Sequence, residues 1–401
     1  MTDVPYTPGH HLALLQGGTE YFPALIAAID ASTQEVRLET YIFNFDTQGE
    51  GVAQALMQAA QRGVQVMVVV DGVGTPEVPL AWRQRWNSAG VHWHRFKPLG
   101  RLGLLIPGRW RRLHRKLAVV DGRVAFCGGI NVLDDWYDPY YGKLESPRFD
   151  FAVQVQGPLV ADVHRTMRQF WGRLQATRQL ERLQWAQAKA SLVRATQATR
   201  TESAGPGDVA GSPAALVLRD NVRNRARIER AYRKALGAAQ HEVIIANAYF
   251  LPGGKLRRAL MHAARRGVRV CLLLNGEYEY FMQYHGARPV YGALLEAGVE
   301  IHEYSTGFLH AKVAVVDGQW ATVGSSNLDP LSLLLAREAN VVVQDAAFAT
   351  QLRQSLLQAI AQHGRKLEGA THARRPLGQR ALDWLAYGLM RLTLMLTGRR
   401  Y

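Results

Sequence analysis

Two stretches of the chain each place a histidine and a lysine two residues apart. His114 and Lys116 begin "HRKLAVVDGRVAFCGGIN", and His310 and Lys312 begin "HAKVAVVDGQWATVGSSN". A neutral imidazole can attack phosphorus, and a second, protonated imidazole can donate a proton to the leaving alkoxide. Two neighbouring lysines could offset the negative charge of the phosphate oxygens. The repeated set therefore predicts phosphoryl or phosphatidyl transfer through a covalent histidine intermediate, without a metal or a cofactor.

The residues that follow each histidine are repeated at the same offsets. Alternating apolar residues predict a strand, in which the histidine and the lysine point to the same face. The next element is an Asp-Gly turn, so Asp121 and Asp317 have a structural explanation that we favour over direct chemistry. Their repeated positions nevertheless keep both in the candidate catalytic set. Small residues and an asparagine end each return strand and are candidates to bind a phosphate, namely Gly129, Asn131, Ser325 and Asn327.

A further acidic residue occupies a matched position in each copy. Asp150 begins the strand pattern of "RFDFAVQVQG", and Glu338 lies in "AREANVVVQD", 188 residues later. Each lysine would lower the pKa of its neighbouring histidine unless an acidic residue opposed it. We therefore expect Asp150 and Glu338 to orient His114 and His310 through the second ring nitrogen. The alternative is that both acids are surface charges at strand ends.

The repeat extends upstream and predicts the architecture. "EVRLETYIFN" and "EVIIANAYFL" are both alternating strands, and a helical pattern leads from each to "RGVQVMVVVDG" or "RGVRVCLLLNG". The separation of matched residues falls from 208 for Tyr41 and Tyr249 to 196 for His114 and His310, as short loop insertions would cause. Alternating strands and helices predict an α/β fold of two pseudo-symmetric halves, each a mixed β-sheet flanked by helices.

Composition divides the chain into four parts. Residues 1–173 and 216–365 are predicted to form the two halves. Residues 174–215 are rich in Gln, Ala, Arg and Thr and then in Gly, Ser and Pro, which predicts a polar helix and a flexible linker. Residues 366–401 form a basic amphipathic tail.

Charge and cysteine content limit the possible partners and compartment. The 401 residues include 48 Lys and Arg against 33 Asp and Glu, a net charge of +15 that would attract nucleic acid or an anionic membrane surface. An inert basic surface is the alternative. Cys127 and Cys271 each lie in an apolar run, which predicts core residues in a reducing compartment. The sequence shows neither a secretory signal nor an apolar run of about 20 residues.

The paired stretches resemble the signature of the phospholipase D superfamily over about residues 10 to 360. That resemblance implies phospholipase D-like halves with the active site at their interface. It also implies that one histidine forms a phosphohistidine while the other acts first as an acid and then as a base. By analogy with many members, His114 is the nucleophile and His310 the acid and base. Four residues would hold the phosphate: Lys116, Lys312, Asn131 and Asn327.

Within that superfamily, "RDNVRNRARIERAY", "ANAYFLPGG" and "SSNLDPLSLLLAREAN" are similar to the bacterial cardiolipin synthases, especially the shorter type without N-terminal spanning helices. The resemblance implies phospholipid substrates: phosphatidylglycerol donates its phosphatidyl group, glycerol leaves, and a second phospholipid attacks. The chain departs from the pattern at Ser325, whose counterpart is Gly129, and at Ala336 and Arg337, where relatives have Asn and Leu. These departures leave the acceptor open.

Two segments predict contact with a membrane. "LGLLIPGRW" could insert Leu104, Leu105, Ile106 and Trp110, with Arg109, Arg111 and Arg112 at the level of the phosphates. In "RALDWLAYGLMRLTLMLTGRRY" the arginines leave a broad apolar face. A buried loop and a terminal core or dimer helix are the alternatives. We expect a peripheral protein on the cytoplasmic side of the bacterial cell membrane, with its oligomeric state open.

Other functions are compatible with the same residues. Water as the acceptor would make the protein a hydrolase, and glycerol would make it a phosphatidylglycerol-forming transferase. A nuclease is permitted by the charge, although the apolar tail makes nucleic acid an unlikely partner. A non-catalytic membrane scaffold is disfavoured by the two intact histidine and lysine pairs.

Overall fold

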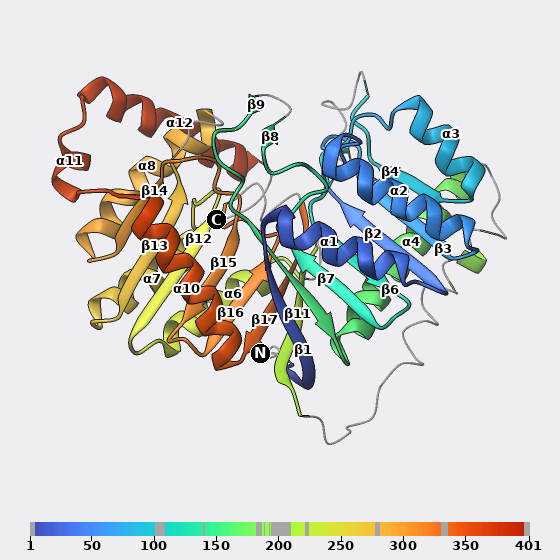
Figure 1. Cartoon of the computed structure of the whole chain (residues 1–401). Coiled ribbons are helices and arrows are strands. Elements are labelled where there is room, and N and C mark those ends of the chain that lie inside the picture. The colour runs from blue at the N-terminus through green and yellow to red at the C-terminus, as the bar shows by residue number, and fades with distance from the viewer. Residues whose placement is uncertain are drawn as a thin grey trace.

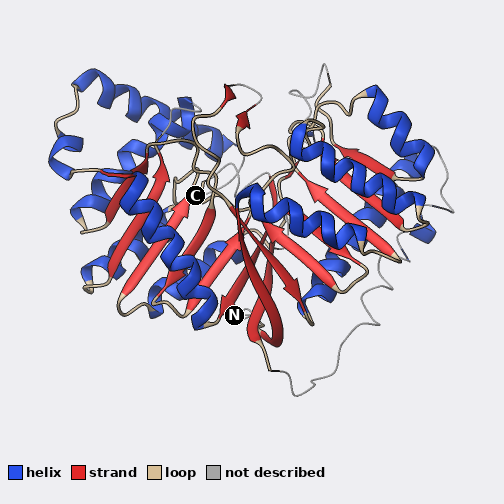
Figure 2. Ribbon diagram, viewed as in Figure 1, coloured by secondary structure: helices blue, strands red, loops and turns tan. Residues whose placement is uncertain are grey.

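The computed structural model describes residues 5–100, 109–138, 141–181, 187, 189–191, 193, 210–220, 224–276, 281–329 and 336–396. Within these residues, sixteen strands form one continuous mixed sheet that runs through both halves of the molecule (Figure 1, Figure 2). β1 (Thr7–Gln16) and β11 (Ser212–Arg219) lie next to each other and antiparallel at its middle. The two halves of the sheet extend outward from this pair.

The strand order is the same on both sides of the β1–β11 pair. On one side it is β1-β10-β7-β6-β2-β3-β4, and on the other β11-β17-β16-β15-β12-β13-β14, with β18 (Gly364–Lys366) at the edge. The three outer strands of each half are parallel: β2 (Glu35–Thr40), β3 (Gln65–Asp71) and β4 (His92–Phe96), and β12 (Glu242–Asn247), β13 (Arg269–Asn275) and β14 (Glu300–Tyr304). The inner strands are antiparallel: β6 (Lys116–Val120), β7 (Val124–Gly128) and β10 (Phe151–Gln156), and β15 (Lys312–Val316), β16 (Trp320–Gly324) and β17 (Ala336–Gln344). The predicted α/β fold of two pseudo-symmetric halves is confirmed.

Helices cover both faces of each half (Figure 1). The outer faces pack against α1 (Gly17–Asp30), α2 (Thr47–Gln61) and α3 (Leu80–Ala89) in the first half, and α6 (Arg227–Ala238), α7 (Gly254–Arg265) and α8 (Phe281–Glu296) in the second. The inner faces share one central core with α4 (Leu159–Glu181) and α10 (Ala346–His363). The described residues also form the short elements β5 (Arg112–Leu113), β8 (Tyr137–Asp138), β9 (Gly142–Lys143) and α11 (Gly369–Ala373), and the 20-residue helix α12 (Leu377–Leu396).

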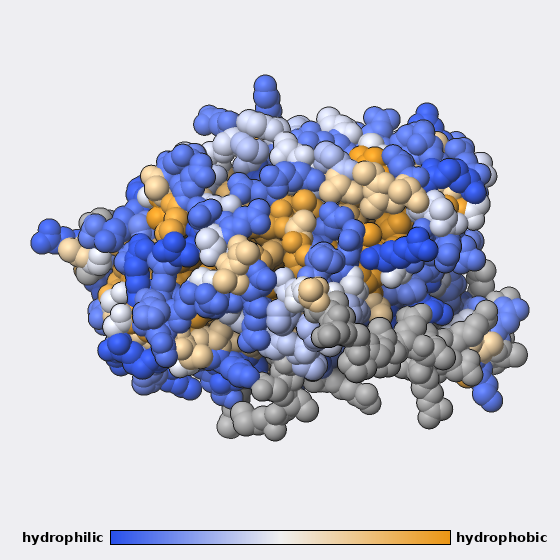
Figure 3. Space-filling view, turned by 60° about the horizontal axis from the view of Figure 1, so that its bottom comes forward, coloured by the Kyte–Doolittle hydropathy of each residue, from blue (hydrophilic) through white to orange (hydrophobic). Residues whose placement is uncertain are grey.

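Side-chain alternation explains how one strand serves two cores. In β6, Leu117 and Val119 belong to the central core, whereas Ala118 and Val120 face the outer helices. Each fully buried Val or Leu stabilises the fold by roughly 1.5–3 kcal/mol. The surface is mostly hydrophilic, and apolar residues gather near the middle of the face in Figure 3.

The two Asp-Gly turns have a structural role. Asp121 and Asp317 adopt φ angles of 50° and 52°, and a glycine with positive φ follows each. The Asp121 carboxylate accepts hydrogen bonds from three successive backbone N–H groups at Thr33, Gln34 and Glu35, and Asp317 does the same at Gln240, His241 and Glu242. Asp121 thus joins the turn of the β6–β7 hairpin to the start of β2 by hydrogen bonds, and Asp317 joins the turn of the β15–β16 hairpin to the start of β12.

These aspartates lie far from the lysines of the repeated set. Five residues of extended strand, about 16 Å, separate Lys116 from Asp121. The inclusion of Asp121 and Asp317 among the candidate catalytic residues is therefore corrected, because their carboxylates bind backbone amides at the opposite end of the strand.

The predicted domain boundaries differ locally from the observed elements. α4 continues to Glu181, past the boundary at 173, because Ala176 is still buried in the protein. β11 begins at Ser212, inside the 174–215 segment. Cys127 and Cys271 are buried, free thiols. Within the described residues, no helix is both long enough and apolar enough to cross a membrane.

Candidate active site

Each histidine lies where its own half touches the other. β5 pairs with β17 of the second half, and the backbone N–H of His114 donates to the Arg337 carbonyl oxygen at 3.1 Å. In the matching place, the backbone N–H of His310 donates to the carbonyl oxygen of Phe149 at 2.9 Å. The residues before β6 and β15 therefore cross to the partner half, so the two-fold arrangement brings both signatures to one interface.

The carboxylates reach the histidines crosswise. Nδ1 of His114 lies 3.0 Å from Oε1 and 3.1 Å from Oε2 of Glu338. Nδ1 of His310 lies 2.6 Å from Oδ2 of Asp150. Each acid thus comes from the half that does not carry its histidine. A carboxylate at Nδ1 favours the tautomer with Nδ1 protonated, which leaves Nε2 available for chemistry.

The two lysines are buried beside the histidines. Lys116 Nζ donates to the carbonyl oxygen of His114 at 2.7 Å, and Lys312 Nζ donates to that of His310. Lys312 Nζ also lies 3.9 Å from Asp150 Oδ2. Burial and the charge of Lys312 lower the pKa of Lys116 to about 7. The two ammonium groups therefore act on each other and form a positive centre at the interface.

Burial lowers the pKa of both histidines. For His114 this effect is opposed by Glu338 and reinforced by Lys116 and Lys312. For His310 burial is reinforced by Lys312, Lys116 and Arg148, and its pKa falls well below the usual value. Both imidazoles are therefore neutral near pH 7 before substrate binds, as a nucleophile must be.

The two carboxylates differ in their protonation. Burial alone would raise the pKa of Glu338, but His114 and Lys116 outweigh it and lower that pKa. Burial raises the pKa of Asp150 to about 7, although Lys312 opposes it. Glu338 is therefore a permanent anion beside His114, whereas Asp150 can share a proton with His310 near neutral pH.

Ser325 and Gly129 support the acids. The buried Ser325 hydroxyl donates to Glu338 Oε2 at 2.5 Å and accepts from the Ala339 N–H at 3.1 Å. Its predicted contact with phosphate is therefore corrected. A Cβ on Gly129 would lie 2.3 Å from Oδ1 of Asp150, and the Gly129 N–H already donates to the Phe151 carbonyl oxygen at 2.9 Å. Gly129 thus provides the space for Asp150 rather than an amide for phosphate.

The two asparagines are buried at the ends of the return strands. Asn131 Oδ1 accepts a hydrogen bond from the Ile42 N–H at 3.2 Å. The neighbour of Asn327, Leu328, donates its N–H to Oδ1 of Asn247 at 3.0 Å. The first bond holds the Asn131 side chain against the segment after β2, and the second holds the residue after Asn327 against the end of β12.

Three further residues act on the site and were missed in the sequence. The ring of Tyr41 lies 5.0 Å from that of His114 and 5.6 Å from Lys116 Nζ. The buried Arg219 pairs in register with Glu338 and lowers its pKa. Arg148 lowers the pKa of His310. The repeat of Tyr41 at Tyr249 was a usable signal, whereas the two arginines have no counterpart that marks them.

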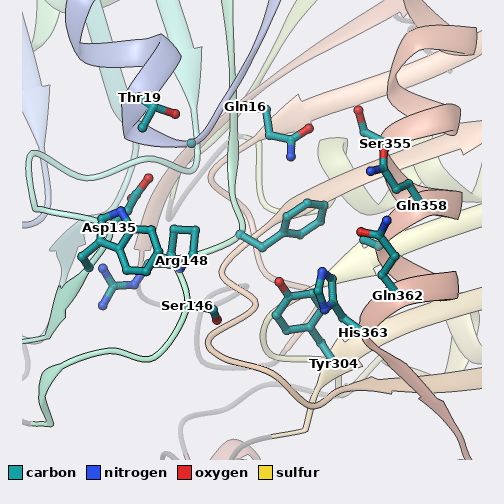
Figure 4. Close-up of a pocket in the computed structure, with 15 residues that line it drawn as sticks. Gln16, Thr19, Asp135, Ser146, Arg148, Tyr304, Ser355, Gln358, Gln362 and His363 are labelled. Atoms are coloured by element: carbon teal, nitrogen blue, oxygen red, sulfur yellow. The ribbon is translucent and has the colours of Figure 1, made fainter.

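A cavity of about 310 Å³ is lined in part by Phe149, whose carbonyl oxygen accepts the His310 N–H (Figure 4). Arg148, Phe149 and Asp135 line it from the first half, and Tyr304 and glutamines of α10 line it from the second. Asp135 accepts the Gly18 N–H at the start of α1, and burial raises its pKa to about 6. The cavity thus spans both halves, and most of its surface is apolar.

One group of possible metal ligands occurs among the described residues, Cys271, Glu300 and His302. It lies at the N-terminal ends of β13 and β14, whereas the histidines lie at the C-terminal ends of the parallel strands. Arg269 binds both oxygens of Glu300 at 3.1 Å. The group therefore has no role in the histidine site.

The comparisons identify the class of protein that this arrangement represents. The sequence matches the family described as "Cardiolipin synthase, PLD-like domain" over residues 25–138 and 232–360, the two regions that contain the repeated histidine and lysine pairs. The chain belongs to this family, as its repeated signature predicted.

Individual relatives support the same conclusion. The chain is 41% identical over 349 residues to cardiolipin synthase B of Salmonella typhi, which covers 87% of this chain and 80% of that protein. It is 40% identical over 348 residues to cardiolipin synthase B of Escherichia coli K12, with the same shares covered. The phosphatidylserine synthase structure from Haemophilus influenzae matches 99% of this chain and 96% of its own with a TM-score of 0.67. At 12% identity that structure supports the fold alone.

Gly129 and Ser325 occupy matched positions in the two copies but differ in side chain. Substituting each by the other's residue tests its contact with Asp150 or Glu338. Gly129→Ser forces Asp150 away from His310, so we expect kcat for phosphatidyl transfer to fall by about 10²-fold or more, the range of acid and base catalysis. Ser325→Gly removes one hydrogen bond from Glu338 and should cost only about tenfold. Steady-state kinetics measure both effects, with thermal unfolding as the control for folding. Equal kcat for Gly129→Ser and the wild type would refute the steric role.

Proposed function

We propose that the protein is a cardiolipin synthase that transfers a phosphatidyl group from phosphatidylglycerol to a second phospholipid, most simply another phosphatidylglycerol. The observation that carries this proposal is the pair of crosswise histidine and carboxylate contacts around two buried lysines. The family of the chain and its relatives at 40% identity support the choice of lipid substrates.

The first step is attack on the donor. Nε2 of His114 forms a bond to the donor phosphorus, and the bond from phosphorus to the glycerol oxygen breaks. That oxygen takes a proton from Nε2 of His310, so free glycerol leaves. Asp150, whose pKa is about 7, gives its proton to Nδ1 of His310 as Nε2 gives up its own, so His310 stays neutral and Asp150 becomes an anion. The negative donor phosphate also raises the pKa of His310 when it binds.

The second step restores the enzyme. The hydroxyl of the acceptor lipid gives its proton to Nε2 of His310 and attacks the phosphorus. The bond between phosphorus and His114 then breaks, which yields cardiolipin and free His114. Lys116 and Lys312 stabilise the charge on the phosphate oxygens in both steps. Asn131 and Asn327 are proposed to bind the same phosphate.

The unequal acids support His114 as the nucleophile. A phosphohistidine ring is cationic, and Glu338 faces His114 with both oxygens and receives a further hydrogen bond from Ser325. A permanent anion stabilises that ring. The acid and base must instead release and regain a proton, and the Asp150 pKa of about 7 suits His310 to that task.

The principal test is the product formed from labelled phosphatidylglycerol in vesicles. We expect cardiolipin and glycerol from the wild type and neither from His114→Ala or His310→Ala. Phosphatidic acid as the sole product would assign a hydrolase instead. Absence of lipid turnover, together with cleavage of DNA, would assign a nuclease.

A donor with a good leaving group separates the two histidines. Nitrophenolate leaves without a proton, so His310→Ala should release about one equivalent from phosphatidyl-p-nitrophenol and then stop, because no base activates the acceptor. His114→Ala should release none. Intact-protein mass spectrometry should find the phosphatidyl group on His310→Ala. The reverse pattern would make His310 the nucleophile.

α12 supports a peripheral position on a membrane. One face packs on α8, where Asp383 binds His285 at 2.7 Å and Arg375 at 2.6 Å. The other face exposes a row of apolar side chains: Leu377, Trp384, Leu385, Leu389 and Leu392. In Figure 1 the helix lies along the upper edge, toward which the parallel strands run. We propose that this row enters the interface of an anionic membrane.

The side of the membrane is part of the same proposal. Two free cysteines are compatible with the reducing cytoplasmic side of a bacterial cell membrane. The predicted insertion of Leu104, Leu105 and Ile106 falls on residues outside the described part of the chain. Trp110 and Arg112 are partly buried, whereas Arg109 and Arg111 are exposed.

Two leucines with nearly equal exposure test the role of α12. Leu385 is 60% exposed on α12 and Leu80 is 62% exposed on α3. We expect Leu385→Glu to weaken co-sedimentation with phosphatidylglycerol vesicles about tenfold or more, since it places a charge in the apolar interface. Leu80→Glu carries the same change and should bind as the wild type. Equal binding of both variants would contradict insertion of α12.

A further inference from the structure

A second cavity, of about 700 Å³, lies between the end of β4, the residues before β5 and the C-terminal half of α4. Six arginines line it, Arg95, Arg109, Arg111, Arg173, Arg178 and Arg337, together with Lys97. No carboxylate is among the described residues that line this basic cavity. Clustered cations raise the local concentration of anions. The basic cavity is therefore suited to an anionic ligand.

Among the described residues, none of the six arginines of the basic cavity forms an ion pair with a carboxylate. Arg95 and Arg109 donate instead to neutral carbonyl oxygens, of Pro76 and Leu99. Arginine presents a planar fork of donors that fits phosphate oxygens. This cavity thus combines the charge and the donor type that phosphate binding requires.

Among the described residues that line the basic cavity, Arg337 is the one that comes from the second half. Its guanidinium lies 5.0 Å from the ring of Phe170, and Arg115 lies at the same distance from that ring. Nε of Arg337 is buried without a hydrogen-bond partner among the described residues. Burial and Arg115 lower the pKa of Arg337 to about 10, opposed by Asp220 and Glu39, which lie outside the cavity lining. A bound anion would remove this repulsion.

The two-fold symmetry relates the basic cavity to the cavity of Figure 4. Arg337 follows Phe149 by 188 residues, the interval that relates Glu338 to Asp150, and each lines its own cavity. The helix positions correspond too, because Gln358 and Gln362 of α10 stand where α4 has Phe170 and Leu174. The duplicated unit thus provides two related cavities, of which one alone is strongly cationic.

The basic cavity begins close to the catalytic pair. Arg337 immediately precedes Glu338, and its carbonyl oxygen accepts the His114 N–H. Arg111 lies three residues before His114, at most about 10 Å along the chain. Successive residues of a strand point to opposite faces, so the side chains of Arg337 and Glu338 lie on opposite faces of β17. The basic cavity and the histidines both lie at the C-terminal ends of the parallel strands, so a lipid that extends around this edge of the sheet can contact both.

We propose that the basic cavity binds the phosphate of the acceptor phospholipid while the donor phosphate is held at His114 and His310. The proposal rests on the proposed transfer reaction. The donor phosphorus must lie between the histidines, whereas the acceptor keeps its own phosphate and presents only a hydroxyl. Binding that phosphate favours a phospholipid acceptor over water or free glycerol, which lack it.

Paired substitutions on two helices test the proposal. Arg173 and Arg178 are exposed on α4 and line the basic cavity, whereas Arg258 and Arg265 are exposed on α7 and do not. Arg173→Gln with Arg178→Gln is therefore matched in charge and setting by Arg258→Gln with Arg265→Gln. Both are assayed with labelled phosphatidylglycerol at varied surface concentration, and cardiolipin, phosphatidic acid and glycerol are measured.

For the α4 variant we expect the apparent KM for the phospholipid acceptor to rise about tenfold and the ratio of cardiolipin to phosphatidic acid to fall. Release of the first equivalent of glycerol per enzyme should stay within about twofold of the wild-type rate, because donor attack precedes acceptor attack and does not use this site. The α7 variant should match the wild type. An unchanged KM and product ratio, or equal losses in both variants, would overturn the proposal.

Two controls separate the possible failures. If the wild type forms no cardiolipin, the transfer reaction is wrong, and that result is distinct from a normal ratio in the α4 variant. Inorganic phosphate at millimolar concentration should inhibit cardiolipin formation in the wild type more than in the α4 variant. Equal inhibition of the two would show that free phosphate acts only at the histidines and would also overturn the proposal.

Discussion

The crosswise contact between each histidine and the carboxylate of the opposite half is the interaction on which the site depends. Neither half holds a complete set, because Glu338 orients His114 and Asp150 orients His310. The backbone contacts also cross between the halves. The backbone N–H of His114 donates to the residue before Glu338, and that of His310 donates to the residue before Asp150. Any change in the relative position of the halves would therefore disturb both histidines together. The continuous sheet through β1 and β11 keeps that position constant.

Burial gives these contacts their chemical effect. In water, two lysines would keep their normal pKa and solvent would screen their charge. At the interface, burial and mutual repulsion bring the pKa of Lys116 to about 7 and hold both histidines neutral. A phosphate that enters supplies the missing negative charge, which favours protonated lysines and a protonated His310. Binding of a phosphate therefore changes the charge state of the lysines and histidines together.

Much of this site could be predicted from the repeat in the sequence, because the repeat shows which residues occur at matched positions in both halves. It marked both histidines, both lysines and both acids, and it predicted the order of strands. It could not show that the acids cross, since pairing between the halves depends on β5 and β17, which are far apart in sequence. It also kept Asp121 and Asp317 in the candidate catalytic set, because a repeated position reports a shared constraint without telling whether that constraint is structural. Ser325, whose counterpart is Gly129, was assigned to the phosphate because the sequence could not show that its hydroxyl donates to Glu338. Arg219 and Arg148 were missed for the opposite reason, since each belongs to one copy alone.

The differences between the copies are as informative as their agreement. A two-step transfer needs two histidines in related places, and this requirement preserves the symmetry of the centre. The two lipids are not equivalent in the reaction, because one gives up its phosphatidyl group and the other keeps it. Residues that contact the reacting phosphate should therefore stay matched, and residues further out should diverge. The structure follows this division: His114 and His310 match, whereas Phe149 and Arg337, one residue before the acids, line a neutral and a cationic cavity. Divergence around a symmetric centre is thus the physical means by which a duplicated fold can distinguish a donor from an acceptor.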